Sequence, residues 1–105
     1  MPDQPYLILA GVRRAVAARE LGWSSIRAVV TAGASAGTVI DVPLVDLYSP
    51  KDRVSRSWQR GRYADIEAAM ADPNTRDAVP DIEVVALRPE RTKYRTRLLD
   101  VTLES

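Results

Sequence analysis

The sequence predicts one mixed α/β domain over residues 1–105, with about five strands and two or more helices. A chain of 105 residues has the size of one ordinary domain. Hydrophobic residues make up 46% of it, enough for a core, although Phe is absent and aliphatic side chains must fill that core. Short β-branched runs alternate with alanine-rich segments at helical spacing, which is typical of mixed α/β domains.

The first elements are a strand, a glycine turn and a helix. Three consecutive apolar residues at 7–9 predict a strand buried on both faces. Gly11 follows as a turn residue, and apolar positions 15, 18 and 21 form a narrow helical stripe that ends at Gly22. The alternating segment 26–31 predicts the next strand, so this part of the chain suggests a crossover unit.

Arg13 and Arg14 stand in the first turn of this helix. The unpaired N–H groups and the dipole at a helix start favour an anion, so two cations are unfavourable there without a ligand. A bound phosphate would explain them. We expect at least one arginine to contact phosphate, whereas the other could pair with a carboxylate such as Asp46 or Asp100. A solvated helix face is the alternative.

The rest of the chain predicts three more strands and one helix. They are strands over 38–47, 82–87 and 93–103, and a helix over 63–71. Pro43 favours a sheet edge or a strand break. The small residues of 32–37 are the linker-like segment. Arg95 and Arg97 alternate along the last strand, where we expect them to face solvent or protect a sheet edge.

Composition excludes several kinds of chemistry. The chain has no Cys, which removes disulfides, thiol catalysis and cysteine metal sites, and no His, which removes the commonest general base. The net charge of +1 permits a local basic site but not a uniformly basic surface. No apolar run has membrane-spanning length and no signal peptide is recognisable. We expect no membrane partner and a cytoplasmic location, or an exported effector domain.

Residues 9–23, with the strand 26–30 behind them, resemble the bacterial ParB/sulfiredoxin superfamily. Members carry a strand, a G-x-R-R turn at a helix start, an alanine-rich helix ending in Leu-Gly, and an I-x-A-x-V strand. In that superfamily the turn binds nucleotide phosphates, CTP in chromosome-partition proteins and ATP in sulfiredoxins. The resemblance covers about a quarter of the chain. It implies phosphate binding by Gly11, Arg13 and Arg14, with a nucleoside triphosphate and Mg²⁺ as the cofactor.

The segments 42–47, 63–71 and 79–85 resemble the front half of the same family, but here they follow the glycine turn. A circularly permuted domain, with 32–37 joining the former ends, explains this order. A domain-swapped homodimer, in which each chain completes the fold of the other, explains it too.

This sequence departs from the family at the catalytic positions. Val12 stands where partition proteins usually have Glu, and the Asp and His of the toxin-like members and the sulfiredoxin cysteine are absent. We therefore assign no catalytic residue. No carboxylate spacing indicates a metal site. An NTPase or nuclease activity would have to work by positioning and charge neutralisation.

A basic segment over 51–62 is the second candidate. It contains Lys51, Arg53, Arg56, Arg60 and Arg62, against one acid. Arg60 and Arg62 could meet phosphates beside the glycine turn while Trp58 stacks on a base. A solvated loop with Trp58 anchored in the core is the alternative.

Three functions follow from these patterns. The first is a domain that binds nucleotide or nucleic-acid phosphates. The second is a polymorphic-toxin effector domain, which would have an immunity protein as partner. The third is a non-catalytic protein-interaction module that uses its edge strand or basic loop.

Overall fold

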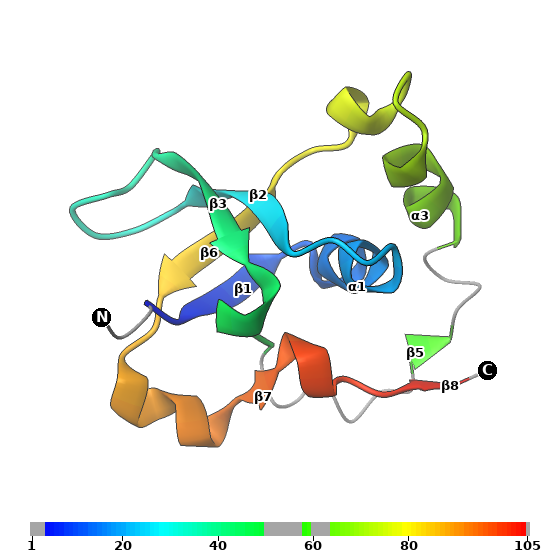
Figure 1. Cartoon of the computed structure of the whole chain (residues 1–105). Coiled ribbons are helices and arrows are strands. Elements are labelled where there is room, and N and C mark those ends of the chain that lie inside the picture. The colour runs from blue at the N-terminus through cyan, green and yellow to red at the C-terminus, as the bar shows by residue number, and fades with distance from the viewer. Residues whose placement is uncertain (1–3, 50–57, 60–63, 105) are drawn as a thin grey trace.

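The computed structural model describes residues 4–49, 58–59 and 64–104 (Figure 1). They form a small α+β domain around a six-stranded mixed sheet in the order β3-β2-β6-β1-β4-β7. The strands of this sheet are β1 (Tyr6–Ala10), β2 (Ser25–Val30), β3 (Val39–Pro43), β4 (Leu47–Ser49), β6 (Ile82–Ala86) and β7 (Thr96–Arg97). The predicted class is therefore confirmed, but the sheet has more strands than expected.

The remaining elements are short. The α-helices are α1 (Val12–Glu20) and α3 (Ala64–Ala71), and the 3-10 turns are η1 (Leu44–Asp46), η3 (Arg76–Ala78), η4 (Pro89–Tyr94) and η5 (Leu98–Asp100). Two further strands, β5 (Trp58–Gln59) and β8 (Leu103–Glu104), pair in parallel apart from the main sheet. None of the helices within the described ranges is long and apolar enough to cross a membrane.

The strand β1 lies inside the sheet, between β6 and β4. It runs antiparallel to β6, with Leu7 opposite Val85, and parallel to β4, with Leu7 opposite Tyr48. Because β2 is parallel to β6, β1 and β2 are antiparallel and not adjacent. The suggested crossover unit is therefore wrong. The strand that pairs with β1 on this side is β6, which follows more than seventy residues later in the chain.

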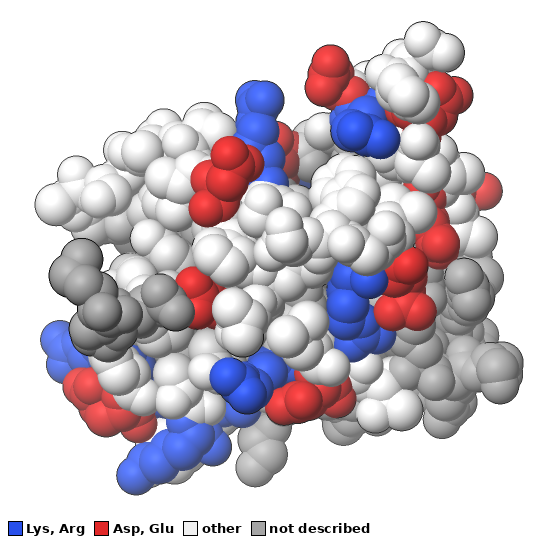
Figure 2. Space-filling model, in the orientation of Figure 1, with Lys and Arg blue, Asp and Glu red and all other residues white. Residues whose placement is uncertain are grey.

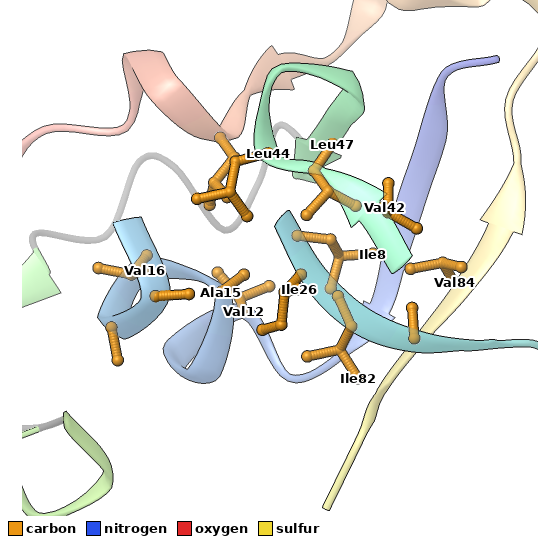
Figure 3. Packing of buried hydrophobic residues seen from close by; sticks show 14 of the residues in the cluster. Ile8, Val12, Ala15, Val16, Ile26, Val42, Leu44, Leu47, Ile82 and Val84 are labelled. Atoms are coloured by element: carbon orange, nitrogen blue, oxygen red, sulfur yellow. The ribbon is translucent and has the colours of Figure 1, made fainter. Parts of the chain in front are cut away.

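The core lies between the sheet and α1, and α3 packs on α1 from the other side (Figure 1). Figure 3 shows Val12 of α1 beside Ile26 and Ile82 of the sheet. The helix buries Val12 and the run Ala15–Ala18, whereas Leu21 is half-buried. This buried face is wider than the predicted stripe because the sheet, α3 and η5 all contact the helix. Small side chains permit such close contact on several sides.

Gly22 ends α1 as predicted. Its φ of 79° is left-handed, its N–H donates to Arg19 O at 3.0 Å, and the N–H of Trp23 donates to Ala18 O at 3.0 Å. These two bonds form a Schellman motif, which satisfies carbonyls that the helix end would leave unpaired.

The linker-like segment is the loop of a hairpin between β2 and β3. Val30 N–H donates to Thr38 O at 2.9 Å, and Gly37 N–H donates to Val30 O at 2.7 Å. Residues 31–39 are exposed, and the hairpin extends away from the rest of the domain at the left of Figure 1. Pro43 ends β3 at one edge of the sheet, which confirms that prediction. The single strand predicted over 38–47 is wrong, because η1 separates β3 from β4.

The predicted strand over 93–103 is wrong. The chain instead forms η4, the two-residue β7, η5 and then β8. β7 pairs with Tyr48 and Ser49, at the end of β4, so its ladder is short. Leu98 and Val101 are both buried, and this spacing of three fits a turn of 3-10 helix rather than a strand. Arg19 fixes the turn by donating through Nη1 to Leu98 O at 2.8 Å and Val101 O at 2.6 Å.

Candidate functional site

The turn between β1 and α1 requires glycine for two reasons. Gly11 has φ 100° and ψ 28°, a left-handed conformation that other residues rarely adopt. A Cβ atom at this position would also lie 2.7 Å from Ile82 Cγ2 and 3.0 Å from Nε and Nη2 of Arg14. A shift in the β1–β6 register between Ile8 and Ala10 directly precedes the turn. Such bulges often redirect a chain beside a functional site.

The start of α1 carries no negative group from its own residues. Gly11 provides no side-chain cap, and the first turn contains no acidic residue. The first helical bond runs from Ala15 N–H to Gly11 O at 3.0 Å. Because the N–H groups of the first turn lack acceptors within an α-helix, the positive end of the helix dipole is available to an anion here.

Arg14 is anchored by main-chain oxygens. Its Nη1 donates to Pro80 O at 2.6 Å and to Asp81 O at 2.7 Å, and the residue is half-buried. The predicted carboxylate partner is therefore wrong, because these partners are carbonyls of the segment that leads into β6. Among the described residues, no acceptor is found for Nε and Nη2 of Arg14, which lie directly beside Gly11. These two nitrogens form one planar edge that can donate bidentately to an oxyanion.

Arg13 is exposed, and no acidic group in residues 4–49 or 64–102 pairs with it. It borders a hollow of about 240 Å³ that is lined by residues 9–14 and by Ile66 of α3. The glycine turn, the helix start and both arginines thus surround one open concavity. The structure therefore brings Gly11, Arg13 and Arg14, the residues singled out from the sequence, together at one hollow.

Val12 provides no chemistry at the turn. It is 2% exposed and packs in the hydrophobic core. The Val12 side chain therefore contributes to core packing. A carboxylate at this position would be buried without a partner, which would lower the stability of the fold considerably. The turn has donors for an anion but no general base of its own.

The second predicted group lies mostly outside the described residues. Arg60 and Arg62 fall there, as do Lys51, Arg53 and Arg56. Trp58 belongs to β5, where it pairs with Leu103, but its side chain lies outside the description. The expectations of phosphate contacts and base stacking by this segment therefore stay predictions.

A second cleft, of about 220 Å³, was not predicted from the sequence. Its wall includes Trp23, with Arg76 stacked above the ring at 5.4 Å and bonded through Nε to Met70 O at 2.8 Å. Arg27 pairs with Asp81 at 3.3 Å on another side. Arg76 and Arg27 already have partners, whereas Arg14 lines both this cleft and the hollow at Gly11. The residues of the cleft are dispersed between positions 14 and 81, and no local pattern could have indicated it.

Metal ligands are sparse. In the part of the chain that the structure describes, no three Asp or Glu side chains gather where they could hold a metal ion.

Comparison of the chain with protein-family models, curated proteins and solved structures gave no match.

Proposed function

We propose that this chain is a ParB/sulfiredoxin-like domain that binds phosphate groups of a nucleotide or nucleic acid at residues 11–14. The observation that carries the proposal is the free edge of Arg14. Two main-chain carbonyls hold its Nη1, and this orients Nε and Nη2 beside Gly11 at a helix start that has no acidic cap. A guanidinium fixed in this way loses little entropy when it binds a ligand.

The chemistry of the turn fits a phosphate better than a carboxylate or a neutral ligand. A phosphate has several charged oxygens, so it can accept from main-chain N–H groups and from the Arg14 edge together. Arg13 adds a second positive charge at the same hollow, where it is exposed and can move toward the ligand.

Two features of the sheet support a permuted chain. Leu87 N–H donates to Pro5 O at 2.9 Å, so the end of β6 lies beside the start of β1. In the family order these strands would follow one another directly. The loop over 31–38 joins β2 to its antiparallel neighbour β3, as a connection between former ends would. A permutation therefore accounts for the order of segments without a second copy of the chain.

The mass of the protein in dilute solution distinguishes the permuted domain from a swapped homodimer. We expect a folded monomer by light scattering, because β4 and β6 of the same chain flank β1. A dimer that dissociates only on unfolding would favour the swap and contradict the permutation.

The role that we propose is binding rather than turnover. The chain has neither His nor Cys, and the buried Val12 removes the carboxylate that the family places at the turn. With a nucleoside triphosphate as ligand, Mg²⁺ would arrive on the phosphates and need one or two protein carboxylates.

A thermal-shift screen against nucleoside triphosphates, with and without Mg²⁺, tests the proposal. At a ligand concentration a hundred times Kd, the free energy of unfolding rises by about 2.7 kcal/mol, which raises Tm by roughly 10–20 °C in a domain of this size. The matching nucleosides, which have no phosphate, serve as controls and should leave Tm unchanged. Equal shifts from nucleosides and triphosphates would exclude phosphate recognition.

A further inference from the structure

A second group of cations occupies the opposite end of β1 from the glycine turn. We call it the η4–β7 surface, and it comprises Arg88, Arg91, Lys93, Arg95 and Arg97. The segment 88–97 has one acidic residue, Glu90. All five cations are exposed, and none has an ion-pair partner among the described acids. Figure 2 shows basic side chains gathered at its lower left, where Figure 1 places η4.

A shallow hollow of about 410 Å³ lies within this surface. Lys93, Arg95 and Arg97 line it together with the hydroxyl groups of Tyr48, Thr92 and Thr96 and the carboxylate of Asp100. The Thr92 hydroxyl already donates to Pro89 O at 2.7 Å, which leaves the three cations and two hydroxyls as donors. Hydroxyl and guanidinium donors are the groups that contact phosphate and sugar oxygens most often in nucleic-acid complexes. The predominance of donors indicates an anionic ligand.

The two arginines of the hollow have a regular spacing. Arg95 directly precedes β7 and Arg97 is its last residue, and both have extended backbone. Their Cα atoms are therefore separated by about 7 Å, with both side chains on one face. A row of cations along an extended segment suits a chain of phosphates better than one compact anion.

Tyr94 places an aromatic ring among the cations. Its side chain is 54% exposed, and Nζ of Lys93 lies 5.1 Å from the centroid of its ring. An exposed ring flanked by basic residues is a platform on which an unpaired base can stack. Duplex DNA would leave this ring unused, because its bases are already stacked on one another.

We propose that the η4–β7 surface binds single-stranded nucleic acid, with phosphates on Lys93, Arg95 and Arg97 and a base stacked on Tyr94. The surface is independent of the glycine turn. Gly11 follows the last residue of β1, whereas η4 follows β6, whose end lies beside Pro5 before β1 begins. The inference goes beyond the proposed function and does not need it to be correct.

Fluorescence anisotropy with a labelled oligo-dT tests this inference over a series of salt concentrations. Each phosphate contact adds about 0.7 to the slope of log K against log salt for a single strand. Arg95→Gln and Arg97→Gln should each lower that slope by about 0.7. Arg27→Gln is the matched control, because it removes the same charge from an exposed position on the other side of the sheet and should leave the slope unchanged.

The stacking step has its own variant. Tyr94→Ala should weaken oligo-dT binding roughly 5- to 150-fold, whereas Tyr94→Phe keeps the ring and should bind like wild type. Duplex DNA of the same length should bind more weakly than oligo-dT. Equal binding of duplex and single strand, with no effect of Tyr94→Ala, would overturn the proposal and indicate a general attraction to polyanions.

The variant Arg13→Gln separates this surface from the glycine turn. In the Arg13→Gln background, Arg95→Gln and Arg97→Gln should each still lower the salt slope of oligo-dT binding by about 0.7, because the two sites lie at opposite ends of β1. Loss of binding in Arg13→Gln, with normal binding in Arg95→Gln and Arg97→Gln, would assign the nucleic acid to the turn and overturn the inference. It would leave the proposed function intact.

Discussion

Gly11→Ala is expected to lower the free energy of unfolding by about 2–4 kcal/mol. Two costs combine in this variant. An alanine at φ 100° is strained by about 1–2 kcal/mol. Its methyl group would also lie 2.7 Å from Ile82 Cγ2, and Ile82 is fully buried in β6, so the strand must shift to make room. Urea unfolding followed by circular dichroism measures the loss.

Gly22→Ala is the matched control. Gly22 also has a left-handed φ, of 79°, but no atom lies within 4 Å of the position of its Cβ. It should therefore show the backbone cost alone, about 1–2 kcal/mol. The difference between the two variants measures the close approach at the turn. Equal losses of unfolding free energy in the two variants would mean that Ile82 and Arg14 do not lie as close to Gly11 as described.

Arg13→Gln is expected to reduce nucleoside triphosphate affinity by about ten- to a hundredfold and to leave stability unchanged. A hydrogen bond between charged groups contributes about 1.5–3 kcal/mol, which corresponds to this range. Stability should not change because Arg13 is exposed and has no partner among the described residues. Calorimetric titration measures the affinity, and urea unfolding of the same sample measures the stability.

Two further variants interpret that result. Arg91→Gln removes an equal charge from an exposed position in η4, away from the hollow, and should bind the triphosphate like wild type. Arg14→Gln should lose both binding and about 1–2 kcal/mol of stability, because Pro80 O and Asp81 O lose their donor. Reversing the charge of Arg13 and Arg14 together would therefore mix the two effects. An Arg13→Gln variant that binds normally would show that the anion does not reach this helix start.

Local patterns predicted the parts of the fold that depend on neighbouring residues. The segment from β1 through Gly11 and α1 to Gly22 was predictable because a strand, a left-handed turn and a helix end are each determined within a few residues. The expected burial of β1 on both faces is wrong, because Ile8 is buried but Leu9 is 43% exposed. The edge position of β3 followed from Pro43 in the same way.

Long-range pairing accounts for what the sequence did not reveal. Alternation over 93–103 suggested a strand, but β4 offers two residues for pairing, and burial of Leu98 and Val101 stabilises turns instead. The antiparallel relation of β1 and β2 depends on β6, which is distant in the chain. No local pattern shows which strand will occupy that place.

For the candidate site, the sequence indicated where the two arginines lie but not what they contact. Both arginines lie in the first helical turn, as the pattern indicated. Arg14 donates to the carbonyls of residues 80 and 81 because the segment between α3 and β6 lies beside the glycine turn. Such a contact between distant parts of the chain is not visible in the local sequence. The sequence suggested different roles for the two arginines without showing which takes which, whereas the structure separates an anchored Arg14 from an exposed Arg13.

The central claim is that the helix start at residues 11–14 binds phosphate. The most direct measurement follows the backbone amide signals of wild type and Arg13→Gln by NMR during the triphosphate titration. We predict that the amides of residues 11–14 shift most in wild type, and that the same amides shift only at much higher ligand concentration in the variant. Largest shifts elsewhere, around the cleft at Trp23 or the η4–β7 surface, would contradict a phosphate site at the glycine turn.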